Sequence, residues 1–102
     1  QQKAFYDELT GLPNRALFLD RARHHLEQEC QREKALSAVM FLDLDGFKTV
    51  NDALGHEAGD RLLVEVGKRI AGSVRPTDTV ARLGGDEFTV LLKNIGNPGI
   101  AL

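Results

Sequence analysis

The sequence predicts an α+β domain in which helices pack against an antiparallel or mixed sheet. Three observations lead to this fold class. Apolar residues recur about every four positions in two long segments, as they do on one face of a helix. Three short apolar runs, at 38–42, 79–83 and 88–92, have the length and composition of strands. The last two runs are separated by a glycine-containing turn, which is typical of a hairpin.

The composition narrows the class of protein. A chain of 102 residues, 42% hydrophobic and 27% charged, has the size and balance of one small globular domain. Its net charge of −2 argues against a surface for duplex nucleic acid or for anionic membrane. No apolar run approaches the ~20 residues that span a bilayer. With a single cysteine, Cys30, there is no internal disulfide, and we expect a half-buried thiol in a reducing compartment, the cytoplasm.

Both ends of the sequence look cut. The first residue is Gln1 and no signal peptide follows it. The last residues begin a new apolar segment after the break at Pro98 and Gly99. We therefore expect residues 1–102 to belong to a longer protein, which could be anchored in a membrane through other domains.

The first helix is predicted from Arg15 to about Lys34. Turn-forming residues precede it, and Asn14 is placed to cap its first turn. The other faces carry charge, so the helix is amphipathic. The histidine pair His24 and His25 lies among these charges and is interpreted as solvated surface rather than as ligands. The apolar stripe recurs every four residues, at Phe18, Ala22, Leu26 and Cys30, and Leu17 and Leu19 widen it.

The first strand, Ala38–Leu42, is apolar at every position. Such a run suits a strand that is covered on both faces in the middle of a sheet. It ends in Asp43 and Asp45, which alternation would place on the same face as each other. Two carboxylates at the end of a buried strand repel each other unless a cation or a donor lies between them.

Residues 46–57 are predicted to form a short helical turn and a loop, and residues 58–74 a second long helix. Asp60 lies in the expected first turn, where the helix dipole favours an acid. Pro76 ends the helix, because proline cannot continue one. The strands at 79–83 and 88–92 are then joined by residues 84–87, GGDE. The apolar side of the second helix consists of Leu62, Leu63, Val66, Ile70 and Val74.

Two acidic sites can converge if the hairpin lies beside the first strand. Asp43 and Asp45 form one, and Asp86 and Glu87 form the other. Oxygen ligands in this number suit Mg²⁺, which uses one or two carboxylates and completes its shell with phosphates and water. The residues therefore favour a metal-dependent enzyme that acts on nucleotides. A tight hairpin with a solvated acidic tip explains residues 84–88 equally well from spacing alone.

Other metal and phosphate motifs fail. A calcium loop starting at Asp43 would need glycine at the position of Lys48 and glutamate at that of Leu54. The zinc motif HExxH would begin at His56, but its second histidine position holds Asp60. No GxxxxGK[ST] phosphate-binding loop is present.

Four segments together resemble the GGDEF domain of diguanylate cyclases. They are DELTGLPNR at 7–15, FLDLDGFKTVND at 41–52, LGHEAGDRLL at 54–63 and GGDEF at 84–88. The resemblance implies an incomplete GGDEF domain over 1–102, with its C-terminal part missing. It implies a ferredoxin-like fold of the type found in nucleotidyl cyclases and polymerase palms. It also implies the synthesis of cyclic di-GMP from two GTP molecules, with release of pyrophosphate, in a homodimer that uses Mg²⁺ or Mn²⁺.

The resemblance also implies roles for individual residues. The metal ligands would be Asp43, the main-chain carbonyl of Leu44, and Asp86. The catalytic residues would be Asp86, Glu87, which supports the same site, and Lys48, which offsets charge on the phosphates. Substrate would contact Asn51 and Asp60, which read guanine, Phe47 and His56, which line the pocket, and Gly84 and Gly85, which let the backbone approach the nucleotide.

An inhibitory site for the product is implied at Arg75 and Asp78, in the RxxD pattern before the signature. The alternative for this pair is a solvated connection between helix and strand. For the domain as a whole, the alternative is a regulatory module that binds GTP or cyclic di-GMP without catalysis, attached to a phosphodiesterase or a sensor. A polymerase-palm fragment is disfavoured because a basic nucleic-acid surface is lacking.

Overall fold

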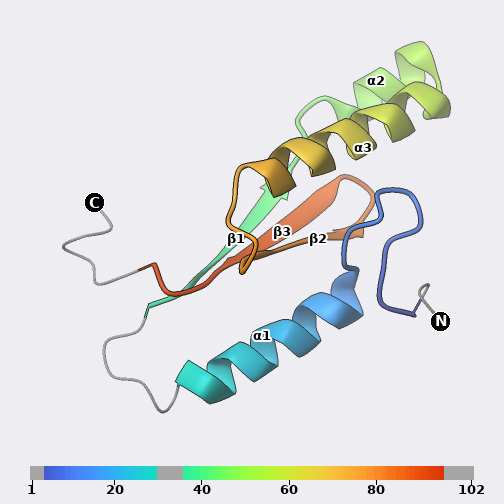
Figure 1. The fold of residues 1–102 in the computed structure, drawn as a ribbon. Helices are drawn as coiled ribbons and strands as arrows, with labels where there is room; N and C mark the ends of the chain where they lie inside the picture. The colour runs from blue at the N-terminus through green and yellow to red at the C-terminus, as the bar shows by residue number, and fades with distance from the viewer. Residues whose placement is uncertain (1–3, 30–35, 96–102) are drawn as a thin grey trace.

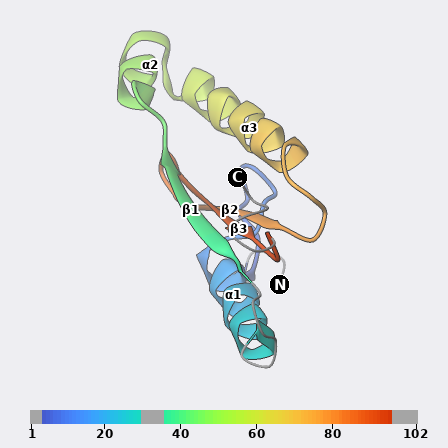
Figure 2. The same ribbon diagram turned by 90° about the vertical axis from the view of Figure 1, so that its left-hand side faces the viewer.

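The computed structural model describes residues 4–29 and 36–95, which form three helices and three strands in a flat molecule of 50 × 36 × 17 Å (Figure 1). Helix α1 lies on one side of the sheet, and α2 and α3 lie on the other (Figures 1 and 2). The predicted α+β class and the predicted order of elements are both confirmed. The elements are α1 (Arg15–Glu29), β1 (Ala38–Asp43), α2 (Phe47–Leu54), α3 (His56–Gly72), β2 (Thr79–Gly84) and β3 (Glu87–Leu92).

The sheet is antiparallel with the order β1-β3-β2. The prediction that residues 38–42 form the central strand is wrong for the part of the chain described, since β3 is central and β1 is an edge strand. Hydrophobicity alone could not distinguish the two, because both strands are apolar at nearly every position. The exposed apolar residues of β1 are Val39, Met40 and Phe41, at 48%, 45% and 73%.

The core lies on both faces of β2 and β3. On the face toward α1, Phe18 packs with Ala81 and Leu91, and Ala22 adds to this cluster. On the opposite face, the ring of Phe88 lies against α3 at Gly67. Burying such side chains contributes about 1.5–3 kcal/mol each, so the hairpin is the best-anchored part of the sheet.

Helix α1 begins at Arg15, as predicted, and Asn14 caps it by accepting a hydrogen bond from the Leu17 amide at 3.1 Å. Two of the expected stripe positions are exposed, Leu19 at 55% and Leu26 at 63%. The buried face instead continues from Phe18 and Ala22 to a histidine three residues on, a spacing that also suits a helix. Cys30 and the predicted continuation to residue 34 lie outside the described residues.

His25 occupies the place expected for Leu26, and its predicted solvation is wrong. Its side chain is 4% exposed, and its Nε2 hydrogen-bonds the hydroxyl of Ser37 just before β1. A polar partner at the end of the loop satisfies the ring, so burial carries little penalty. His24 is exposed, as predicted, and its Nδ1 lies 2.9 Å from the carbonyl oxygen of Asp20.

Helix α3 starts at His56, two residues before the predicted start, and only Gly55, with φ +94°, separates it from α2. Glu57 therefore lies in the first turn, and Asp60, expected there, follows it. The helix ends at Gly72, ahead of Pro76, as predicted. None of the helices in residues 4–29 and 36–95 is long and apolar enough to cross a membrane.

Candidate functional site

Two carboxylates face each other at one end of the sheet. Asp43 ends β1, Glu87 begins β3, and the two residues are direct partners in the antiparallel register. Partners in a register share a face of the sheet, with Cβ atoms about 4.5–5.5 Å apart. Both residues are exposed, and no described lysine or arginine forms an ion pair with either. Two neighbouring carboxylates without such an ion pair can bind a cation.

The turn between β2 and β3 brings a third acid to the same end of the sheet. The predicted hairpin is confirmed, but Gly84 pairs with Glu87, so the connection consists of the two residues Gly85 and Asp86 and not of the four that were expected. Gly85 has φ +48°, a region that glycine adopts without the strain of other residues. No atom lies within 4 Å of the place where a Cβ would stand at Gly84 or Gly85, so the turn has an open side.

Asp45 does not join this group by strand alternation, because β1 ends at Asp43 and Asp45 lies in the turn before α2. The prediction that the two aspartates share a strand face is therefore wrong. Between them, the carbonyl oxygen of Leu44 accepts a hydrogen bond from the Phe47 amide at 3.3 Å. A carbonyl has two lone pairs, so this oxygen can still accept a second partner.

The donor set at this end of the sheet fits a hard divalent cation. It consists of oxygen atoms only, from Asp43, Asp86, Glu87 and the backbone at Leu44. Among the described residues, no three His, Cys, Asp or Glu side chains form a cluster that could hold a metal by themselves. That arrangement suits Mg²⁺, which binds through one or two carboxylates and leaves the remaining positions to water and phosphates.

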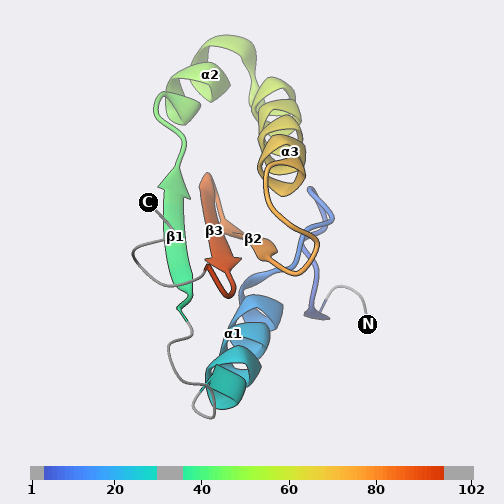
Figure 3. The ribbon, with the colours of Figure 1, turned by 60° about the vertical axis from the view of Figure 1, so that its left-hand side comes forward.

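The residues expected to read guanine lie on the α2–α3 pair, beyond the end of β1 (Figure 3). The Oδ1 atom of Asn51 is buried, and no donor among the described residues reaches it. A buried acceptor without a donor is uncommon and destabilising. Because α3 covers this oxygen, the N–H group of a ligand could reach it only after the Asn51 side chain turns.

The structure does not bring the other residues expected to bind substrate together in one pocket with Asn51. Asp60 is exposed and lines a cleft of about 340 Å³ with Leu9 and Val64. Asn51 is not among the residues that line this cleft. Lys48 and His56 are exposed on α2 and α3, and Phe47, half-buried, lies beside Gly59.

Arg75 and Asp78 pair with each other in the connection between α3 and β2. Arg75 donates from Nη2 to Oδ1 at 3.1 Å and from Nε to Oδ2 at 3.2 Å. Asp78 also accepts from the backbone amides of Arg75, at 3.0 Å, and Lys93, at 2.9 Å. The Asp78 side chain is 2% exposed and that of Arg75 is 52% exposed, so the carboxylate is not the solvated group that the alternative described.

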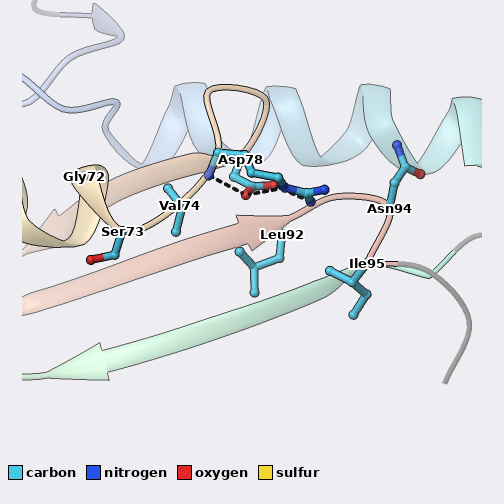
Figure 4. Close-up of a pocket in the computed structure, with 8 residues that line it drawn as sticks. Gly72, Ser73, Val74, Asp78, Leu92, Asn94 and Ile95 are labelled. Atoms are coloured by element: carbon cyan, nitrogen blue, oxygen red, sulfur yellow. Dashed lines mark hydrogen bonds and ion pairs between the residues drawn. The ribbon is translucent and has the colours of Figure 1, made fainter. Parts of the chain in front are cut away.

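A groove of about 580 Å³ runs beside this pair (Figure 4). Burial opposes ionisation of Asp78, but the hydrogen bonds from Arg75 and from the Lys93 amide outweigh it and lower the pKa of this carboxyl. The lining comes from three parts of the chain: Gly72 to Arg75, Asp78, and Leu92 with Asn94 and Ile95. The expected inhibitory pair therefore borders a concave surface.

Sequence reasoning missed two features next to the site. Arg82, two residues before Gly84, donates to the carbonyl of Gly85 and to Asp7, although Asp7 is 75 residues away in sequence. Gly59 and Gly67 lie inside α3 and are buried. A glycine inside a helix costs about 1 kcal/mol relative to alanine, so its presence was a signal of close packing.

Comparison with known proteins identifies relatives over almost the whole chain. The family model described as "Diguanylate cyclase, GGDEF domain" matches residues 4–101. Three similar proteins come from Pseudomonas aeruginosa. The bifunctional diguanylate cyclase/cyclic di-GMP phosphodiesterase MucR is 53% identical over 90% of this chain, the diguanylate cyclase TpbB 49% over 98%, and the cyclic di-GMP phosphodiesterase NbdA 55% over 89%. The chain covers 13%, 23% and 12% of these relatives, respectively.

Solved structures agree with the fold. A TpbB variant comprising only the GGDEF domain superposes with a TM-score of 0.86, at 48% identity, over 95% of this chain and 56% of that one. The coiled coil and GGDEF domain of DgcB from Caulobacter crescentus, in complex with c-di-GMP, gives 0.85 at 28% identity, over 97% and 51%. The chain thus spans little more than half of these two solved chains.

Proposed function

Since the chain belongs to the GGDEF family of diguanylate cyclases, we propose that it is the catalytic part of an enzyme that condenses two GTP molecules into cyclic di-GMP and two pyrophosphates. One observation carries the proposal. Asp43 and Glu87 are partners in the β1–β3 register, beside Asp86 in a turn with an open side. Carboxylates so placed can hold a cation against the phosphates of a nucleotide.

Asp43, Asp86 and the carbonyl oxygen of Leu44 would hold Mg²⁺ or Mn²⁺, and Glu87 would support the same site. When bound, the metal supplies positive charge to the reacting phosphate and to the attacking hydroxyl. Lys48 would offset charge on the phosphates. The turn glycines would allow the main chain to lie close to the nucleotide.

Guanine would be held between α2 and α3. After its side chain turns, Asn51 can accept a hydrogen bond from a guanine N–H group through the oxygen that has no donor among the described residues, and Asp60 can accept another. Phe47 and His56 would line the pocket. An adenine would offer an acceptor where guanine offers N–H, so the same residues would discriminate against ATP.

Two copies of the domain would be needed for turnover, each presenting one GTP. The 3′-hydroxyl of one GTP would attack the α-phosphate of the other, pyrophosphate would leave, and a second attack with the roles exchanged would close the ring. Each chain contributes mainly by positioning its own nucleotide. Since the substrate is GTP, we propose that the domain acts in the cytoplasm.

Cyclic di-GMP would also bind as a feedback inhibitor in the groove at Arg75. Nε and Nη2 of Arg75 are engaged by Asp78 and by the carbonyl of Lys93, which leaves Nη1 to donate to phosphate or guanine oxygens. Asp78 already accepts four hydrogen bonds, so its main part would be to orient Arg75. Complexes of related GGDEF domains with c-di-GMP support this ligand.

A second candidate is a regulatory domain that binds GTP or cyclic di-GMP without forming product. It is favoured by the 55% identity to NbdA, a relative named as a phosphodiesterase only. Retention of Asp43 and of the full GGDEF signature argues against it.

A product assay separates the two candidates. The full-length protein is incubated with GTP and Mg²⁺, and the nucleotides are resolved by chromatography, with Asp86→Ala in parallel. A cyclase forms cyclic di-GMP and loses this activity in Asp86→Ala. Binding of GTP without any cyclic dinucleotide in the wild-type protein would identify the regulatory domain instead.

A further inference from the structure

Asp7 and Arg82 form an ion pair beside the turn that carries Asp86. The side chains of Arg82 and Asp7 are only 15% and 16% exposed, and Nη1 of Arg82 donates to Oδ1 of Asp7 at 2.8 Å. The other two guanidinium nitrogens of Arg82 both donate to one backbone oxygen. Nε and Nη2 donate to the carbonyl oxygen of Gly85 at 3.0 and 2.8 Å.

The carbonyl of Gly85 belongs to the peptide group that leads into Asp86. A peptide group is planar, so fixing its oxygen also fixes the direction of the following amide and of the Asp86 backbone. Turn residues with two adjacent glycines have many alternative conformations, since glycine restricts φ so little. The guanidinium selects one of these conformations through two hydrogen bonds to the same oxygen.

Asp7 is itself held in place. Its Oδ2 accepts hydrogen bonds from the amide and the hydroxyl of Thr10, each at 2.8 Å. The amide of Asp7 donates to Leu12, and the amide of Arg82 donates to Pro13, so the segment is tied to itself and to β2. Figure 1 shows this N-terminal segment beside the β2–β3 turn.

We propose that the Asp7–Arg82 pair acts as a positioning device for the carboxylates of Asp86 and Glu87, and so controls the affinity of the site for a divalent cation. The inference rests on the proposed function for its effect on turnover, but not for its effect on metal binding. Arg82 contacts neither metal nor substrate in this proposal; it acts through the Gly85 carbonyl.

For Arg82→Met, the loss of charge and the loss of positioning predict opposite changes in cation affinity. Arg82→Met removes a positive charge near the acidic turn, which by charge alone would strengthen cation binding. If the guanidinium positions the turn, the same variant binds the cation more weakly. Arg82→Lys keeps the charge but replaces the fork of donors with a single ammonium, and should weaken cation binding as well.

The experiment measures Mn²⁺ binding to the full-length protein by the loss of the free Mn²⁺ signal in electron paramagnetic resonance, with Mn²⁺ alone as the probe. Asp43→Asn identifies the component of binding that belongs to the site. We expect Arg82→Met and Arg82→Lys each to raise the dissociation constant of that component by about tenfold. Arg69→Lys, which alters an exposed arginine paired with Glu65, is the matched control and should leave it unchanged.

Turnover is the second readout. In Arg82→Lys we expect kcat to fall about tenfold or more, while KM for GTP at saturating metal changes less than about threefold. If either Arg82 variant fails to fold, Asp7→Asn is measured in its place and should also weaken Mn²⁺ binding, because it removes the charge of the partner and replaces one of two acceptor oxygens with an NH2 group that cannot accept.

Unchanged or tighter Mn²⁺ binding in folded Arg82 variants would overturn the inference, as would a wild-type protein without any Asp43-dependent Mn²⁺ binding. A wild-type protein that binds Mn²⁺ but forms no cyclic dinucleotide refutes the proposed function alone. In that case the Mn²⁺ dissociation constants of the variants still decide the positioning role.

Discussion

Gly59 of α3 lies directly against the side-chain amide of Asn51 in α2. A Cβ at Gly59 would stand 1.8 Å from Oδ1 and 2.8 Å from Cγ of Asn51, closer than atoms can approach. The same Oδ1 is the buried acceptor without a donor among the described residues. The absence of a side chain at Gly59 therefore sets the position of the group that we propose reads guanine.

Substitution Gly59→Ala should weaken GTP binding. The new methyl group must displace the Asn51 amide, and overpacking of this kind costs about 1–3 kcal/mol. We expect a GTP affinity at least about tenfold lower by calorimetry. Gly72→Ala is the control, because a Cβ there meets no atom within 4 Å, and it should leave affinity unchanged. Equal affinities for Gly59→Ala and wild type would show that Asn51 does not contribute to GTP binding.

Asp43 and Asp45 should differ in their importance, although they are two residues apart. Asp43 faces Glu87 across the strands, whereas Asp45 lies in the turn beyond β1. We expect Asp43→Asn to lower the rate of cyclic di-GMP formation by about 100-fold, and to raise the Mg²⁺ concentration needed for half-maximal rate. Asp45→Asn should retain the rate within about threefold. A larger loss in Asp45→Asn than in Asp43→Asn would contradict the arrangement of the site.

Arg75→Ala should relieve product inhibition, and it should also lower stability, because it removes two of the four hydrogen bonds to the buried carboxylate of Asp78. The inhibition constant for cyclic di-GMP, measured from initial rates, should rise by about tenfold or more, because a charge-assisted pair of donors is lost. Arg23→Ala, which removes an exposed arginine paired with Asp20, is the control. Inhibition of equal strength in Arg75→Ala would exclude the groove in Figure 4 as the inhibitory site.

Asp78→Asn should lower the free energy of unfolding by about 1–3 kcal/mol, since the side chain is buried and accepts four hydrogen bonds. Urea denaturation at pH 7 measures the difference from wild type. Asp20→Asn, at an exposed carboxylate, should change stability far less. A loss no larger than that of Asp20→Asn would contradict the structural role of Asp78.

The stability difference between wild type and Asp78→Asn should depend on pH in one direction. The pKa of Asp78 in the folded protein lies below its ordinary value of 3.8, so the unfolded chain takes up the proton first as pH falls. The contribution of the carboxylate is therefore complete well above pH 3.8 and is lost as pH falls through the folded-state pKa. Urea midpoints from pH 7 to pH 2 should converge only in acid; convergence near neutral pH would contradict the assignment.

Elements that depend on neighbouring residues could be predicted from the sequence. The cap at Asn14, the glycine turn after β2 and the end of α3 before Pro76 each depend on residues a few positions apart. The acidic pairing of Asp43 with the hairpin was predictable only as a possibility, because register depends on how two distant strands align.

Features that depend on long-range packing were not predictable in the same way. His25 is buried because Ser37 lies within reach of its ring, a contact made across the loop between α1 and β1. Arg82 meets Asp7 through the tertiary fold alone. Helix periodicity favoured Leu26 over His25 on grounds of hydrophobicity, but the two positions differ by only about 100° around the helix.

The central place of β3 in the sheet has a consequence for how the protein is made. Within residues 4–29 and 36–95, β1 and β2 both pair with β3 and not with each other, so neither has a partner among these strands until residues 87–92 have been synthesised. More than forty residues must be synthesised after β1 before β3 begins. During that time the apolar β1 segment is unpaired, and unpaired strands of this kind are prone to aggregate. We expect the acidic end of the sheet to form in a late step of folding, governed by this long-range pairing.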